Sequence, residues 1–191
     1  MTFPLLTIIA VTLLMYYSFD KSWLFNWNGI REEIKDTVKI AQNKLVSGRF
    51  VGEGGVKSSQ YNRRKWIMKT ATVSELLKLT DYPNGTIKTI AYEGLLRKPH
   101  FHDKSNIALK AISETDYFTN YESGCMVTDM TIGEYIVDYV LQIGDLSPPP
   151  PPGGFGLKFG ISEEECEKLL NEYRKVPGLL RKNTLHNKAY N

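Results

Sequence analysis

The chain has few cysteines, since Cys125 and Cys166 are the only two among its 191 residues. They can form at most one intramolecular disulfide, so the sequence is not a disulfide scaffold. Their spacing matches no zinc-binding pattern, and His100, His102 and His186 add no further ligand set. We therefore expect no metal site and no cofactor.

A strong charge bias is also missing. The 24 Lys and Arg residues against 21 Asp and Glu residues leave a formal net charge of +3. This excess is too small to indicate a nucleic-acid partner by itself, and we expect none. The hydrophobic content of 42% and the charged content of 24% are typical of a globular domain.

The sequence lacks a recognisable catalytic constellation. The segment GEGGVKSS at residues 52–59 is glycine-rich, but Val56 stands where a phosphate-binding loop requires glycine before Lys57. A glycine-rich hairpin or a flexible loop explains the segment better. Glu134 and Asp138 are four residues apart on a predicted helix, where exposed acids are the ordinary interpretation. We therefore expect that the protein is not an enzyme. In the alternative that it is one, the catalytic residues would be Glu134 and Asp138, or His100 and His102.

The chain is organised around residues 72–98, which predict two helices joined by a turn. Thr72 and Glu75 have the spacing of a capping box at the start of the first helix. Pro83 within the Tyr-Pro-Asn-Gly turn ends this helix. In the second helix, the small Gly94 lets two helix backbones approach closely.

This helical hairpin resembles one unit of the HEAT-like family of helical repeats. The family has a turn with proline or aspartate, then a branched aliphatic, a basic residue, an alanine and a leucine. The matching residues are Pro83, Ile87, Lys88, Ala91 and Leu95. The resemblance covers residues 72–98 and implies a helical domain.

An uncharged apolar segment runs from Phe3 to Phe19, the shortest length that spans a bilayer core. No basic residue precedes it and no small-residue cleavage site follows it, so we predict an uncleaved membrane anchor. A cleaved signal peptide is the alternative. The basic residues after the segment place the following domain in the cytoplasm by the positive-inside rule. An exported domain remains the alternative, with Asn84-Gly85-Thr86 as a glycosylation sequon.

Residues 30–46 have the apolar period of an amphipathic helix, which we interpret as packed on the domain or as a stalk. A position on the membrane surface is the alternative. A locally basic stretch follows within residues 57–69, and it contains no acidic residue. Arg63, Arg64, Lys65 and Trp66 are its candidates for contact with an anionic surface. A solvated helix face is the alternative interpretation.

Residues 113–130 are polar and predict a long loop between helices, with a turn at Ser123-Gly124-Cys125. Tyr117, Phe118 and Tyr121 lie in this loop among acidic residues. Because tyrosine is frequent in the energetically dominant positions of interfaces, these aromatics are our candidates for contact with a partner.

The five prolines at residues 148–152 predict a stiff polyproline spacer. After it, Ser162 and Glu165 again have capping-box spacing at the start of a helix ending near Gly178. This helix is too short to be stable alone and must dock on the domain or on another protein.

Together these patterns predict a mainly α fold with six segments. They are an anchor or signal (1–22), a stalk helix (23–47), a HEAT-like helical domain (48–146), a spacer (147–160), a docking helix (161–178) and a basic tail (179–191). The predicted function is that of a single-pass, membrane-associated, non-enzymatic protein that binds or adapts another protein. An immunity-type inhibitor of a partner protein and an enzyme with an unrecognised site are the alternatives.

Overall fold

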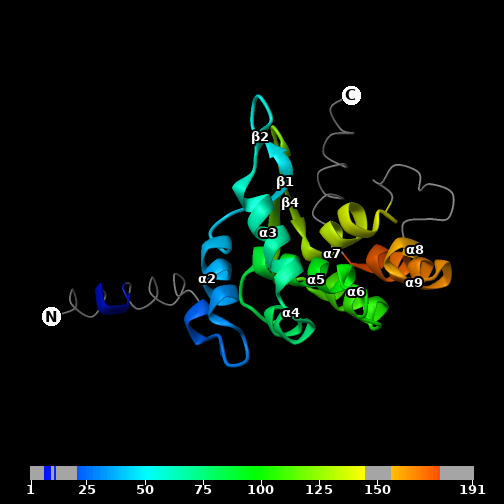
Figure 1. The fold of residues 1–191 in the computed structure, drawn as a ribbon, viewed down its shortest axis with the longest axis horizontal. Coiled ribbons are helices and arrows are strands. Elements are labelled where there is room, and N and C mark those ends of the chain that lie inside the picture. The colour runs from blue at the N-terminus through cyan, green and yellow to red at the C-terminus, as the bar shows by residue number, and fades with distance from the viewer. Residues whose placement is uncertain (1–6, 10, 12–20, 145–155, 177–191) are drawn as a thin grey trace.

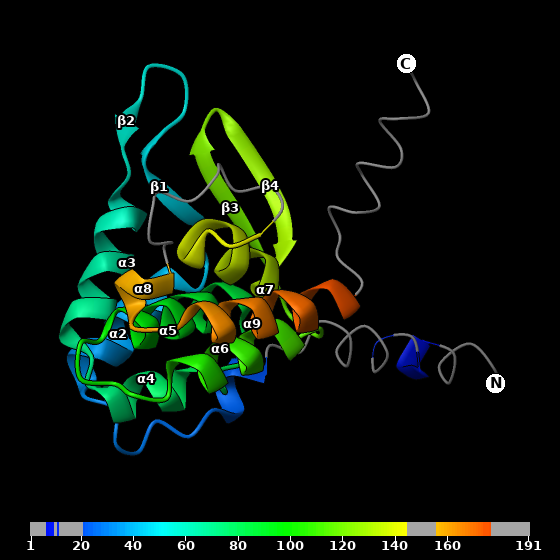
Figure 2. The same ribbon diagram turned by 90° about the vertical axis from the view of Figure 1, so that its right-hand side faces the viewer.

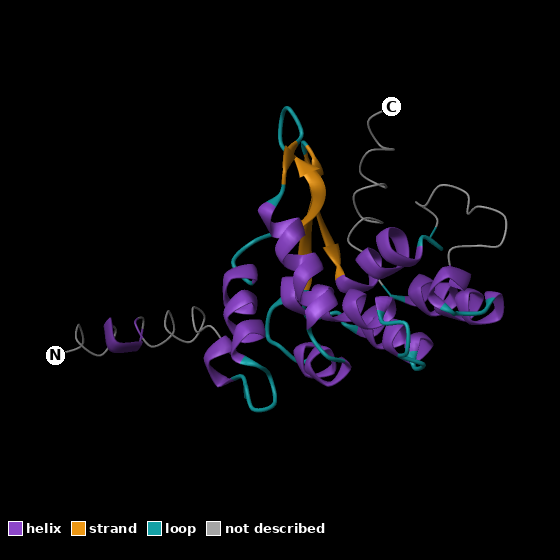
Figure 3. Ribbon diagram, viewed as in Figure 1, coloured by secondary structure: helices purple, strands orange, loops and turns teal. Residues whose placement is uncertain are grey.

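The computed structural model describes residues 7–9, 11, 21–144 and 156–176. A helical body and a four-stranded mixed sheet are formed by residues 21–144 and 156–176 (Figures 1 and 3). The helical elements are η1 (Lys21–Leu24), α2 (Glu32–Ala41), α3 (Ser59–Thr70), α4 (Val73–Leu79), α5 (Gly85–Arg97), α6 (Lys104–Ser113), α7 (Ile132–Glu134), the π-helix η2 (Tyr135–Leu141), α8 (Gly156–Phe159) and α9 (Glu163–Lys175). The strands are β1 (Val46–Val51), β2 (Val56–Lys57), β3 (Phe118–Gly124) and β4 (Met126–Thr131).

Helix α5 is the centre of the helical body. Every residue from Gly85 to Leu96 is buried, and α5 packs against α3, α4 and α6. The predicted hairpin is present as α4 and α5. A Cβ added to Gly94 would lie 3.0 Å from Cδ2 of Leu76, so the small residue does permit the close approach of these helices.

Three helix starts carry capping boxes; those at Thr72 and Ser162 confirm the predictions above, and the third begins at Thr131. In each, the capping hydroxyl accepts the backbone N–H three residues on, and the Glu carboxylate accepts the N–H of the capping residue. The pairs are Thr72 with Glu75, Thr131 with Glu134, and Ser162 with Glu165.

The mainly α prediction is wrong, because a sheet with the strand order β2-β1-β3-β4 packs on the helical body. Strands β1 and β3 are parallel, while β1–β2 and β3–β4 are antiparallel. Residues 113–130 are therefore not a long loop between helices. The sequence pattern did not predict this strand, because β3 buries the polar Thr119 and exposes the apolar Phe118. A half-buried strand normally has its apolar residues inside and its polar residues outside.

Strand β1 also shortens the predicted stalk helix. Helix α2 ends at Ala41, and Val46 begins β1 instead of continuing the helical stripe. The buried face of α2 is nevertheless the predicted one, with Ile34, Val38 and Ala41 inside.

The predictions of a membrane span and of a single-pass membrane protein are contradicted. Nowhere in the described ranges is a helix long and apolar enough to cross a bilayer. Of the segment from Phe3 to Phe19, the structure describes residues 7–9 and 11, and the rest lies outside the described residues.

Helix α9 docks on the body, chiefly against α6. Leu169 is fully buried there, and Oη of Tyr173 donates to Oδ2 of Asp138 at 3.2 Å. The five prolines of the predicted spacer and the predicted basic tail lie outside the described residues.

Candidate binding surface

Two hairpins, β1–β2 and β3–β4, end side by side at the far end of the sheet. The backbone N–H of Gly52 donates to the carbonyl of Gly124 at 2.8 Å, and Val51 is the register partner of Gly124. Both hairpins extend beyond the helices that cover the base of the sheet (Figure 2). We call the five apolar residues at this end the hairpin tip: Phe50, Val51, Val56, Met126 and Val127.

A pair of methionines in β4 shows where the covering helices stop. Met126 and Met130 are four residues apart in one strand, so their side chains point to the same face of the sheet. Met130 is 0% exposed, whereas Met126 is 70% exposed. The helices thus bury the base of this inner face and leave its end open to solvent.

The outer face of the hairpin tip is also apolar. Val51 lies opposite both Val56 and Gly124, and Val127 lies opposite Glu122. Since Glu122 and Gly124 are two residues apart in β3, the three valines share this face. Val56 is 65% exposed and Val127 is 56% exposed. The hairpin tip therefore exposes apolar side chains on both faces.

Glycines make the two turns of the hairpin tip possible. Gly52, Gly54 and Gly55 have φ values of 71°, 90° and 66° in the β1–β2 turn. In the tight β3–β4 turn, Gly124 is the first central residue and has a φ of 56°. Glycine with positive φ at that position is the requirement of a two-residue II′ hairpin, so the sequence defines the turn.

Two carboxylates, Glu122 and Asp129, lie on the outer face of the β3–β4 hairpin. Asp129 is exposed and lies opposite Asn120, while Glu122 is half-buried. Among residues 21–144 and 156–176, no basic side chain forms an ion pair with either carboxylate. This face of the hairpin therefore has two carboxylates without an ion-pair partner among those residues.

Beneath the inner face, a buried polar network connects α3, α5 and η2. Nη1 of Arg64 donates to Oη of Tyr135 at 2.5 Å, and that hydroxyl donates to Oε2 of Glu93 at 3.0 Å. Nε of Arg97 donates to the other oxygen of Glu93 at 2.8 Å. Burial and the charge of Glu93 raise the pKa of Tyr135 well above its usual value, so the phenol stays protonated.

The π-helix η2 packs its tyrosines against the sheet. The ring of Tyr121 lies 5.5 Å from that of Tyr135 and 4.6 Å from that of Tyr139, between ring centroids. Desolvation raises the pKa of Tyr139. Tyr121 is thus a packing residue of the inner face.

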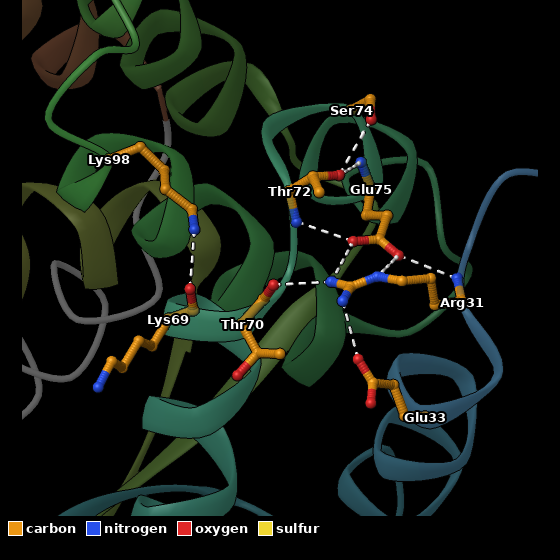
Figure 4. Close-up of polar contacts among 8 residues, drawn as sticks. All are labelled: Arg31, Glu33, Lys69, Thr70, Thr72, Ser74, Glu75 and Lys98. Carbon is orange, nitrogen blue, oxygen red and sulfur yellow. Dashed lines mark hydrogen bonds and ion pairs between the residues drawn. The ribbon is translucent and has the colours of Figure 1, made fainter.

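A second polar network, around Glu75, joins the N-terminal part of the body to α4 (Figure 4). The carboxylate of Glu75 accepts from the backbone N–H of Arg31 at 2.9 Å and from its Nε at 3.0 Å. Burial alone raises the pKa of Glu75, but the bonds from Arg31 and Thr72 outweigh it and lower the pKa to about 2. Because Arg31 also donates to the carbonyl of Thr70, this network fastens the chain before α2 to the α3–α4 junction.

The structure does not bring the predicted contact aromatics together. Phe118 is 51% exposed on the outer face, whereas Tyr121, three residues later, points to the inner face. Tyr117 is half-buried, with Nζ of Lys88 4.6 Å from its ring centroid.

The predicted basic stretch is also divided. Arg64 is buried in the network beneath the sheet, and Nη1 of Arg63 donates to the side chain of Gln60 at 2.8 Å. Lys65 and Trp66 remain exposed on α3. These four residues do not form a single basic surface.

The acids and histidines of the enzyme alternative do not form a common site. Glu134 is buried, and its carboxylate accepts from the backbone N–H of Thr131 at 2.6 Å. Asp138 is buried too, so the expectation of exposed acids is wrong for both. His100 and His102 are exposed in the connection before α6.

Clefts on the described part of the chain contain lysines and apolar residues. One of about 660 Å³ lies between α6 and α9 and is lined by Leu109, Ile112, Lys110, Lys168 and Lys175, among others. Ammonium groups are not metal ligands. Among the described residues, no three His, Cys, Asp or Glu side chains are placed to hold a metal ion.

Comparisons with known proteins found no family model, no curated protein and no solved structure that matches this chain. The resemblance to HEAT-like repeats therefore stays a prediction. The residues of the hairpin tip were not among the predicted contacts. Their signal was the pair of glycine turns with apolar residues on either side, which alone predicted only a hairpin or loop at residues 52–59 and an isolated turn at residues 123–125.

Proposed function

We propose that the chain is a non-enzymatic binding protein that recognises a protein partner through the hairpin tip. The observation that carries this proposal is the exposure of Met126 on the same strand and face where Met130 is fully buried. Exposed apolar side chains gathered in one place are a frequent property of protein interaction sites. The bond from the N–H of Gly52 to the carbonyl of Gly124 joins the two hairpins, and this restraint on the tip lowers the entropy cost of binding.

A capture experiment tests this function with the full chain as bait in a mild detergent extract of the cells that express it. The tip variant carries Val56→Ser, Met126→Ser and Val127→Ser. The matched control variant carries Ile40→Ser, Trp66→Ser and Leu77→Ser, which are exposed apolar positions away from the tip. Thermal unfolding of all three proteins checks that the variants fold.

We expect a stoichiometric protein partner with the wild type and with the control variant, and its loss with the tip variant. Calorimetry with the purified partner should then give similar affinities for the wild type and the control variant, and a much weaker affinity for the tip variant. Equal capture by the tip variant, or no stoichiometric partner with any of the baits, contradicts the proposal.

A further inference from the structure

Within the described part of the chain, no strand pairs with the outer side of β4, so β4 is an edge of the sheet. Its pairing with β3 runs without interruption from Phe118 opposite Thr131 to Ser123 opposite Met126, and β4 is the last strand in the order. An edge strand presents a row of backbone N–H and C=O groups that can pair with another strand. Figure 2 shows β4 at the margin of the sheet.

The two edges of the sheet differ in their protection. The edge strand β2 has only two residues, and one of them is Lys57. Shortness and lysine are both devices by which proteins prevent edge pairing. Strand β4 has six residues, MVTDMT, with no proline, no lysine, no bulge and a single charge at Asp129. Of the two edges, β4 is the one suited to accept a strand.

The charge beside this edge selects the chemistry of an added strand. A strand paired with β4 would place one side chain directly opposite Asp129, at a distance where opposite charges attract. Glu122, one strand further in, adds a second negative charge on the same face. A basic side chain is favoured opposite Asp129, and an apolar one opposite the exposed Val127.

We infer that the partner adds an extended, basic segment to the edge of β4, with lysine or arginine opposite Asp129 and β-branched residues at its neighbours. In strand addition, the main-chain hydrogen bonds supply the affinity, and contacts of every second side chain of the added strand supply the specificity. A second copy of the chain fits less well, because β4 itself has no basic side chain to place opposite Asp129. This inference rests on the proposed binding function and specifies how the partner binds.

A peptide selection tests the inference on the full chain. A phage-displayed library of random dodecapeptides is selected against the wild-type protein, and the enriched consensus peptide is synthesised. We expect alternating β-branched and basic residues without an internal proline. Asp129→Lys should weaken its binding about tenfold, and exchange of the basic residue for glutamate should restore the affinity to this variant.

The matched control is Asp36→Lys on α2, which reverses an exposed carboxylate away from the sheet and should leave the affinity unchanged. Two further peptides are N-methylated at alternate residues, one in each register, so that one of them lacks the N–H groups that face β4. Loss of binding by one N-methylated peptide and retention by the other is the signature of strand pairing.

Several results overturn the inference: no enriched peptide, an acidic consensus, equal binding to Asp129→Lys, or equal binding of both N-methylated peptides. Self-association of the wild type that Asp129→Lys strengthens also overturns it. If a peptide needs the hairpin tip but still binds when it is N-methylated in either register, strand addition is wrong while binding at the tip stands. The proposed function is tested separately by the capture experiment, where equal capture by the tip variant or the lack of a partner contradicts it.

Discussion

The helical body and the hairpin tip use apolar residues in opposite ways. In α5 every residue from Gly85 to Leu96 is buried, including Lys88 and Glu93, whose charges are paired inside. At the tip, Phe50, Val56, Met126 and Val127 are exposed, and the charged groups nearby on the outer face have no ion pair in the described part of the chain.

This difference separates what stabilises the fold from what is available for binding. Burial of apolar area supplies the main free energy of folding, so the body should control stability. Side chains that stay in solvent contribute little to the free energy of unfolding. We therefore expect substitutions in the body to change stability, and substitutions at the tip to change binding alone.

The largest effect should come from Glu93→Gln in the network beneath the sheet. The substitution removes the charge that compensates the buried guanidinium of Arg64, 3.6 Å away. Loss of one partner of a buried ion pair costs about 3 to 5 kcal/mol. Urea unfolding measures the free energy, with the exposed Glu164→Gln as the control. A loss below 1 kcal/mol would show that Arg64 does not depend on Glu93.

A smaller effect should come from Glu75→Gln, and it should depend on pH. The lowered pKa of about 2, against an ordinary value of 4.5, stabilises the fold above pH 4.5. This contribution is lost as the pH falls from 4.5 towards 2. Because Arg31 is 47% exposed, solvent screens the pair, and we expect about 1 to 2 kcal/mol.

The measurement is the difference in unfolding free energy between the wild type and Glu75→Gln, followed from pH 7 to pH 2.5. The difference should shrink on acidification within that window. A difference that stays constant with pH would assign the loss to packing and not to the charge.

The smallest effect should come from Met126→Ser, whose cost in unfolding free energy should stay within about 0.5 kcal/mol. Met130→Ser is its matched control, with the same residue type on the same strand and face. Removal of that buried side chain should cost about 2 to 5 kcal/mol. Equal losses of stability for the two variants would mean that Met126 is also buried and that the tip is not open.

Local signals in the sequence predicted much of the body. The capping box at Thr72 and Glu75 and the apolar stripe of Ile34 and Val38 depend on neighbours within one or two helical turns. Such short-range patterns can be recognised without tertiary contacts. The helical hairpin of α4 and α5 followed from them.

The sheet and the candidate binding surface depend on contacts between distant residues. Ser47 and Thr119 are buried in strands where apolar residues would have been the expected signal, so the period of two was absent. The place of Arg64 was decided by Tyr135 and Glu93, far away in the sequence. No pattern within α3 could separate this arginine from its exposed neighbours.

The parallel pairing of β1 with β3 has a consequence for how the molecule forms. Residues 52–117 lie between these strands and include α3, α4, α5 and α6. Contacts of such long sequence separation form slowly, because loop closure must precede them. We expect the strands to meet only after the helices have assembled, so an incompletely folded chain would lack the joined hairpins of the proposed binding surface. Recognition would thereby be restricted to molecules whose folding has reached completion.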